Sequence, residues 1–164
     1  MPRDPLLVGR IGALAGAGMW LFIGGQAIVP VAALALAFLA ATIGMVWWLD
    51  IKRGRAAPLQ EMPMRIVVAD LVTAGVWTIG TAPNPRSIAF VIIVAVGALA
   101  MYRLGRAGIV ATMFTFLVAR VGMEVIRIAF AQPTPAPQLL AEIIVTSLAV
   151  LILAATVDSY RAEQ

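Results

Sequence analysis

The feature that most constrains this chain is a series of six apolar segments, which together take up most of its 164 residues. Each approaches the roughly 20 residues that a helix needs to cross a hydrocarbon core of about 30 Å. The chain is 62% hydrophobic and 12% charged, whereas a soluble domain is about 45–50% apolar and about 25% charged. We therefore predict an all-α, polytopic membrane protein, a bundle of six transmembrane helices. We expect the helices near residues 7–24, 27–49, 65–80, 87–102, 108–130 and 138–157.

The basic residues predict the direction in which these helices run. They gather before the first segment, between the second and third, between the fourth and fifth, and after the sixth, whereas only Arg86 stands in a turn on the other side. Cytoplasmic loops carry this excess of positive charge, so both termini are predicted to be cytoplasmic. The residues behind this prediction are Arg3, Arg10, Lys52, Arg53, Arg55, Arg65, Arg103, Arg106 and Arg161.

Composition also excludes several classes of function. The chain has no cysteine and no histidine, which removes disulfides, haem ligation through imidazole and nearly every zinc or copper site. A Ser-His or Cys-His nucleophile is impossible, and we expect neither an enzyme, a metal nor a cofactor. The net charge of +4 lies between the apolar segments, where it sets topology. The lipid bilayer is therefore the expected partner, and nucleic acid is not.

Charged residues inside the fifth segment are the first candidates for a functional site. Arg120, Glu124 and Arg127 are four and three residues apart, so they share one helical face. An ionisable side chain at this depth costs a few kcal/mol or more unless it is paired or hydrated. At about 1.5 Å of rise per residue, Glu142 of the sixth segment lies at the level of Glu124, in the outer half of the membrane. These four charges sum to zero and could meet there.

Two interpretations of this charged set remain open. In the first, Arg120–Glu124 and Arg127–Glu142 are ion pairs that lock the fifth and sixth helices together. In the second, the four residues line a cavity that opens to the outside and binds a small polar or anionic ligand, with Arg120 as the deep anchor. Charge balance favours the first, and the rarity of charges within membranes favours the second.

Asp70 of the third segment is a further candidate ligand-binding residue, near the inner surface. It is expected to accept hydrogen bonds from a neighbouring helix, or to reach Arg65 or Arg103; a role in proton relay is the alternative. Gly12 and Gly16 stand four residues apart in the first segment, a spacing that lets helices approach closely. They are expected to serve packing within the bundle, with a dimer face as the alternative.

From Arg65 onward the chain resembles a known family. Arg65 and Asp70 are followed by a turn with Pro83, and then by the basic, glycine-containing turn of residues 101–108. The order of these elements resembles the six-helix N-terminal sensor region of bacterial histidine kinases and diguanylate cyclases. Residues 158–164 are similar to the start of the signalling helix that connects such sensors to their output domains. The matched elements read Arg65-Ile66-Val67-Val68-Ala69-Asp70-Leu71, Gly80-Thr81-Ala82-Pro83, Met101-Tyr102-Arg103-Leu104-Gly105-Arg106-Ala107-Gly108 and Asp158-Ser159-Tyr160-Arg161-Ala162-Glu163-Gln164.

This resemblance implies a multi-pass sensor domain in the bacterial inner (cytoplasmic) membrane. It would act as a homodimer in signal transduction of the two-component type, and pass a ligand- or membrane-derived signal to a cytoplasmic output domain outside these residues. Residues 1–157 would form the membrane domain and 158–164 the start of the signalling helix. The signal itself stays open between a quinone, a lipid, a small anion and the mechanical state of the bilayer.

Two alternatives to a sensor are kept. One is a small transporter or permease-like protein, in which Asp70, Arg120 and Glu124 form a polar path across the membrane. The other is a structural subunit of a larger membrane complex. The distance in depth between Asp70 and Arg120 argues against the first of these.

Overall fold

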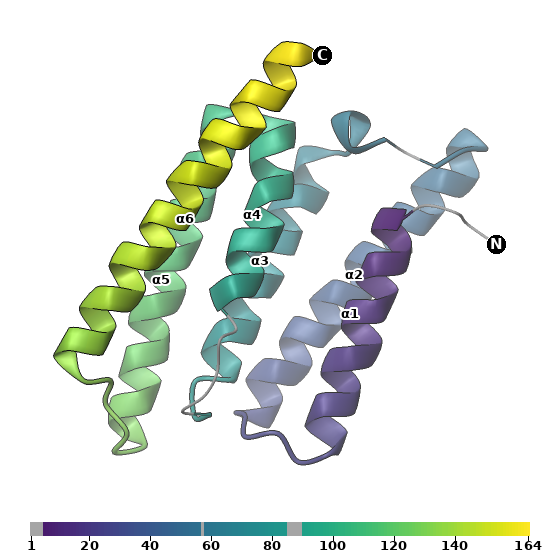
Figure 1. Ribbon diagram of the computed structural model, residues 1–164. Helices are drawn as coiled ribbons and strands as arrows, with labels where there is room; N and C mark the ends of the chain where they lie inside the picture. The colour runs from purple at the N-terminus through teal and green to yellow at the C-terminus, as the bar shows by residue number, and fades with distance from the viewer. Residues whose placement is uncertain (1–4, 57, 85–89) are drawn as a thin grey trace.

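The computed structural model describes residues 5–56, 58–84 and 90–164. Consecutive helices run in opposite directions, so Pro5 and Gln164 lie at the same end of the bundle (Figure 1). We call this the terminal end, and the opposite end the distal end. The elements are α1 (Pro5–Phe22), α2 (Val29–Arg53), the 3₁₀ turn η1 (Leu59–Glu61), α3 (Met64–Gly80), α4 (Phe90–Leu104), α5 (Arg106–Ala129) and α6 (Ala136–Glu163).

Four of the described helices, α1, α2, α5 and α6, are long and apolar enough to cross a membrane. Helix α3 has 17 residues, and α4 has 15 in its described part. The all-helical fold with several apolar helices is confirmed, whereas six crossings and cytoplasmic termini stay predictions. Arg86 and the predicted start of the fourth segment at residue 87 lie outside the described residues.

Proline and glycine set several of the helix ends. Pro30 and Pro137 stand in the first turns of α2 and α6. Backbone N–H groups in a first turn have no acceptor within the helix, so proline removes no helical hydrogen bond there. Gly54 ends α2 with a φ of 69°, and Gly105 separates α4 from α5 with a φ of 61°, conformations that favour glycine. Helix α6 runs on to Glu163, so no break in helical structure marks the predicted boundary between residues 157 and 158.

The helices stand in three neighbouring pairs, with α3 and α4 between α1–α2 and α5–α6 (Figure 1). Helix α3 packs against α2, α4 and α5, whereas α1 packs against α2. Helix α6 packs more extensively against α4 than against α5. The first helix is therefore at the edge of the bundle, and α3 is at its centre.

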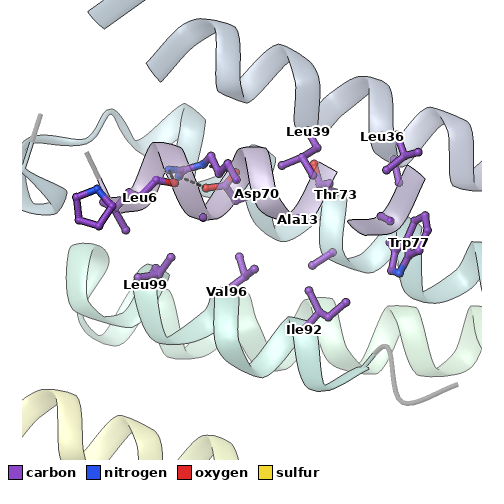
Figure 2. A pocket seen from close by; sticks show the side chains of 16 residues that line it. Leu6, Ala13, Leu36, Leu39, Asp70, Thr73, Trp77, Ile92, Val96 and Leu99 are labelled. Atoms are coloured by element: carbon purple, nitrogen blue, oxygen red, sulfur yellow. Dashed lines mark hydrogen bonds and ion pairs between the residues drawn. The ribbon is translucent and has the colours of Figure 1, made fainter. Parts of the chain in front are cut away.

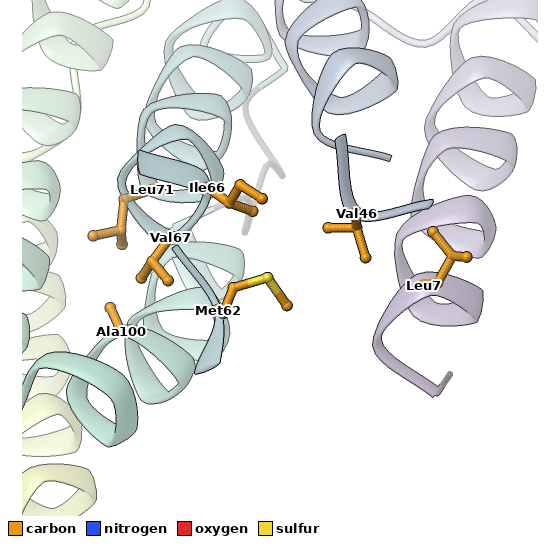
Figure 3. Close-up of a cluster of buried hydrophobic side chains, with 7 residues drawn as sticks. All are labelled: Leu7, Val46, Met62, Ile66, Val67, Leu71 and Ala100. Carbon is orange, nitrogen blue, oxygen red and sulfur yellow. The ribbon is translucent and has the colours of Figure 1, made fainter. Parts of the chain in front are cut away.

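A cluster of buried apolar side chains joins α1, α2, α3 and α4 near the terminal end (Figure 3). Met62, which precedes α3, is fully buried in it and bridges toward α2. A second cluster connects α3, α4 and α5 through Ala74, Ile93, Phe116 and Ala119. The first cluster comprises Leu7, Val46, Met62, Ile66, Val67, Leu71 and Ala100.

Helix α5 turns its polar and several of its small residues inward, together with Phe116 and Met123, while most of its large apolar residues point outward. This is the reverse of a helix on a water-soluble protein, and it suits a surface in contact with hydrocarbon. The buried residues are Gly108, Thr112, Phe116, Ala119, Arg120, Met123 and Arg127. The exposed ones include Val110, Phe114, Leu117, Val118, Val121, Val125 and Ile128.

Glycines allow α4 and α5 to approach closely. A Cβ atom on Gly108 would overlap the backbone of Ala100, and one on Gly97 would overlap the side chain of Thr112. By contrast, a Cβ on Gly12 or Gly16 would meet no described atom within 4 Å. The prediction that these two glycines serve packing within the bundle is therefore wrong, because they lie on the exposed face of α1.

The two ends of the bundle are held together differently. At the distal end, the backbone N–H of Ile28 donates to the carbonyl of Gly80 at 2.7 Å, which ties the start of α2 to the end of α3. At the terminal end, the described links include exposed side chains: the Tyr102 hydroxyl donates to Gln164 Oε1 at 2.9 Å and accepts from Gln60 Nε2 at 2.6 Å. Main-chain contact thus fixes the distal end more directly.

Candidate functional site

The structure brings the charged residues of α5 and α6 together in the distal half of the bundle. Arg120 is 4% exposed; its Nη1 donates to Glu124 Oε2 at 3.2 Å, and its Nη2 lies 3.0 Å from Glu142 Oε2. Both carboxylates therefore flank one guanidinium and lie at a similar level. The ion pair between Arg120 and Glu142 links α5 directly to α6.

Arg127 is arranged differently from the prediction. Its Nε donates to the carbonyl oxygen of Ala82 at 3.2 Å, and its Nη1 donates to the hydroxyl of Thr134 at 2.9 Å. Among the described residues, no ion pair joins it to Glu142. The predicted Arg127–Glu142 pair is wrong, because Arg120 holds that carboxylate while Arg127 finds neutral acceptors.

Thr134, in the turn between α5 and α6, connects the members of this cluster. Its hydroxyl oxygen accepts from Arg120 Nη2 at 3.3 Å as well as from Arg127 Nη1, and its backbone N–H donates to Glu124 Oε1 at 2.9 Å. The sequence prediction missed this residue. The available signal was a single hydroxyl between Pro133 and Pro135, close in the chain to the charged set.

We call Arg120, Glu124, Arg127, Thr134 and Glu142 the distal charged cluster. Its two positive and two negative side chains balance, and nearly all of their polar atoms have partners. Within the described part of the chain, Arg120 Nε is a buried donor without a hydrogen-bond partner, a state that costs about 1–3 kcal/mol. The arrangement can hold α6 on α5, and it leaves the Nε donor of Arg120 unsatisfied.

Asp70 lies in a separate cluster and not with Arg120. Arg10 of α1 binds it with two groups: Nη2 pairs with Oδ2, and Nε donates to Oδ1 at 3.3 Å. The two side chains are 9% and 11% exposed. Of the partners expected from the sequence, Arg103 instead donates from Nε to the Met62 carbonyl at 2.8 Å.

Arg10 was not predicted as the partner of Asp70, because it was treated as one of the basic residues that set topology, although the predicted range of residues 7–24 already contains it. Helix α1 begins at Pro5, so Arg10 lies inside it. Arg10 and Asp70 stand roughly 8 and 9 Å from the starts of their helices. Counting about 1.5 Å of rise per residue, as was done for Glu124 and Glu142, would have placed Arg10 and Asp70 at the same depth in the membrane.

A cavity of about 290 Å³ lies beside this ion pair, between α1, α2, α3 and α4. Asp70 and Leu6 stand at one end of it and Trp77 at the other, while Val96 and neighbouring residues of α4 form one wall (Figure 2). None of the residues of the distal charged cluster lines it. The predictions made from the sequence did not include this cavity.

A second, polar pocket of about 280 Å³ opens at the terminal end. Its lining combines hydroxyl, amide and guanidinium groups, and the rings of Tyr102 and Tyr160 lie 6.0 Å apart beside it. The described residues contain no group of three or more acidic side chains that could hold a metal ion. The residues that line this pocket are Gln60, Tyr102, Arg103, Arg161 and Gln164.

Fold and surface together define the class of the chain: a multi-pass helical membrane protein, with several apolar helices and two separate buried charged clusters. No family model, curated protein or solved structure matches the chain. The family resemblance noted from Arg65 onward therefore stays a prediction.

Proposed function

We propose that this chain is a membrane-embedded signal-input domain, in which α6 carries a conformational change from the distal charged cluster to the terminal end. The observation that carries the proposal is the form of α6, an uninterrupted helix of 28 residues. Glu142, near its start, binds Arg120, and Gln164, which follows it, accepts a hydrogen bond from Tyr102. A single rigid element thus connects a buried charged cluster to the opposite end of the bundle.

The Arg120–Glu142 ion pair is the contact that a signal would change. Because α6 packs mainly against α4, this pair is a principal link between α5 and the distal part of α6. A small anion that binds Arg120 in place of Glu142 would favour a state with α6 released. A ligand shifts such an equilibrium only through a contact that differs between the two states, and exchange of this carboxylate supplies one.

The geometry gives less support to a transporter. That function needs polar groups along one path through the membrane. Asp70 is engaged by Arg10 between α1 and α3, whereas Arg120 and Glu124 belong to the cluster of α5 and α6. No described ion pair or hydrogen bond joins the two clusters.

The proposal includes a cellular setting that rests on the sequence resemblance. It comprises the bacterial inner membrane, a homodimer, cytoplasmic termini and an output domain that follows residue 164. The basic residues at helix ends and the similarity of residues 158–164 to a signalling helix support this setting.

The test is a chimera in which a histidine-kinase catalytic domain follows Gln164. Glu142→Gln removes the charge that binds Arg120 but leaves Glu124 in place, so the variant should fold. We expect kinase output to change by at least about fivefold, the lower end of usual coupling between sites. The measurement is autophosphorylation in membrane vesicles, normalised to the amount of chimera.

Glu61→Gln is the matched control, because Glu61 forms exposed ion pairs with Arg53 and Arg55 outside the helical bundle. Its chimera should match the unchanged chimera in output. Equal output from all three proteins at equal membrane levels would contradict the proposed function.

A further inference from the structure

The cavity beside Arg10 exists because one face of α1 is made of very small residues. Gly9, Ala13 and Ala17 follow one another at intervals of four and line it, so they share a helical face. A Cβ on Gly9 would meet no described atom within 4 Å. This face is therefore too small to fill the space between α1 and the helices opposite.

Two side-chain contacts bridge α1 and α3 at either end of this space. Toward the terminal end, Arg10 binds Asp70. Toward the distal end, the rings of Trp20 and Trp77 meet edge to face, with centroids 5.8 Å apart. Asp70 and Trp77 are two turns, roughly 10 Å, apart along α3. The two bridges set the separation of α1 from α3, and the side chains of Ala13 and Ala17, with Gly9, are too small to fill the space that this separation leaves.

The walls of the cavity are apolar over most of their length. Leu36 and Leu39 of α2 face it, with Ile92, Val96 and Leu99 on α4 (Figure 2). The hydroxyl of Thr73 also lines it, but that group donates to the carbonyl of Ala69 at 2.8 Å and is satisfied within its own helix. Among the described lining residues, charged groups occur only at the end formed by Arg10 and Asp70.

We propose that this cavity holds one hydrocarbon chain of a membrane lipid, with an ester carbonyl of that lipid at the Arg10–Asp70 pair. An apolar wall without partner atoms forfeits dispersion contacts, and a hydrocarbon chain in the cavity would restore them. The volume of about 290 Å³ is near the lower end of small-molecule sites, which start at about 300 Å³. The hydrocarbon of the bilayer is the apolar material that surrounds α1.

The ion pair selects the polar group of this lipid. A guanidinium has five N–H donors, and Arg10 uses three of them toward described atoms of Asp70 and Leu6. Further donors remain for an oxygen acceptor. Asp70 already neutralises the charge of Arg10. The carboxylate of a free fatty acid would therefore be repelled by the carboxylate of Asp70, and an uncharged ester carbonyl fits this site better. This inference does not depend on the signal-input proposal.

The experiment uses the full chain in nanodiscs that contain a phosphatidylcholine with a diazirine in one acyl chain. After illumination, mass spectrometry locates the lipid adducts. Thr73 and Ala74 are 8% and 3% exposed, so only a chain inside the cavity reaches them. Val121, which is 65% exposed on α5, serves as the reference for ordinary contact with the bilayer. We expect adducts at both places in the unchanged protein.

Ala13→Phe should fill the cavity and lower the adduct at residues 73–74 by at least about tenfold, which corresponds to about 1.4 kcal/mol. Ala15→Phe is the matched control, since Ala15 is exposed and does not line the cavity. It should keep both adducts, and Val121 should be labelled equally in all proteins. Ala17→Leu is a second, smaller filling change for use if Ala13→Phe does not fold.

Either of two labelling outcomes would overturn the placement of a lipid chain in the cavity. One is labelling of the unchanged protein at Val121 but not at residues 73–74. The other is equal labelling of residues 73–74 in the unchanged protein and in a folded filling variant. A parallel set of nanodiscs with a diazirine fatty acid tests the polar group: stronger labelling by the free acid than by the ester would also contradict it.

Discussion

Three arginines among the described residues are buried within the helices, and each is stabilised by a different set of acceptors. Arg120 lies between two carboxylates, Arg10 binds one carboxylate, and Arg127 binds a carbonyl and a hydroxyl. Removal of one partner from a buried charge is expensive because the remaining charge stays desolvated. Arg127 has the fewest charged partners, so it depends most on Thr134.

We predict that Thr134→Val destabilises the protein by about 1–3 kcal/mol, because Arg127 loses a hydrogen-bond acceptor in a buried place. Valine has nearly the shape of threonine and keeps the backbone N–H that donates to Glu124. Thermal unfolding in detergent measures the effect. Thr134→Ser keeps the hydroxyl and should unfold close to the unchanged protein; equal loss in both variants would show that the hydroxyl is not the cause.

Part of the distal charged cluster followed from spacing alone. Arg120 and Glu124 are four residues apart on one helix, and the depth count brought Glu142 to their level. The role of Thr134 did not follow, because it depends on the path of the turn after α5, where Ala131 has a φ of 54°. Such turn geometry is set by tertiary contacts, and helical periodicity carries no information about it.

At the scale of whole helices, the apolar runs predicted where helices lie but not which faces meet. Helix α6 continues six residues past the predicted end of the sixth membrane segment at 157, into the residues that the family resemblance implies are the start of a signalling helix. The glycines of α1 and those of α4 and α5 all lie within apolar segments, so the sequence does not distinguish them. A Cβ on Gly97, Gly108 or Gly122 would come within 3 Å of a neighbouring helix, whereas a Cβ on any glycine of α1 would meet no described atom within 4 Å. The packing of the whole bundle decides this difference.

We predict opposite effects for the same substitution at two glycines. Gly108→Ala should destabilise the protein, because its methyl group would overlap the backbone of Ala100. Gly12→Ala should be neutral or stabilising by up to about 1 kcal/mol, since alanine favours a helix and no described atom lies near. Thermal unfolding of both variants in one detergent checks this. A more stable Gly108→Ala protein would contradict the close approach of α4 and α5.

A distance measurement tests whether α6 moves as one element. The chain contains no cysteine, so spin labels can be attached at Ser159→Cys and Ala107→Cys without further changes. Both positions are exposed at the terminal end. We expect Glu142→Gln to broaden or shift the distribution of distances between the two labels. An unchanged distribution would mean that the Arg120–Glu142 pair does not control the far end of α6.

At the scale of the whole molecule, the placement of both ends of the chain on one side follows from six antiparallel helices (Figure 1). The side itself was predicted from basic residues, which lie at the terminal end in Lys52, Arg103 and Arg161. We predict that a membrane-impermeant maleimide labels Gln132→Cys in intact bacterial cells, but labels Ser159→Cys only after the cells are opened. The reverse pattern would invert the topology.

Backbone contacts hold the distal end of the bundle more firmly than side-chain contacts hold the terminal end, and this difference affects how α6 can move. The distal end is tied by the backbone contact of Ile28 with Gly80 and by the Arg127–Ala82 bond. The turn that leads into α6 is held to this end through Thr134, whose hydroxyl accepts from Arg120 and Arg127, so α6 can pivot there. From Glu142 to Glu163, α6 extends roughly 30 Å. A tilt of about 5° at this pivot would displace its far end by about 3 Å over that length. A small tilt of α6 at the distal charged cluster would therefore produce a larger displacement at the terminal end of the helix.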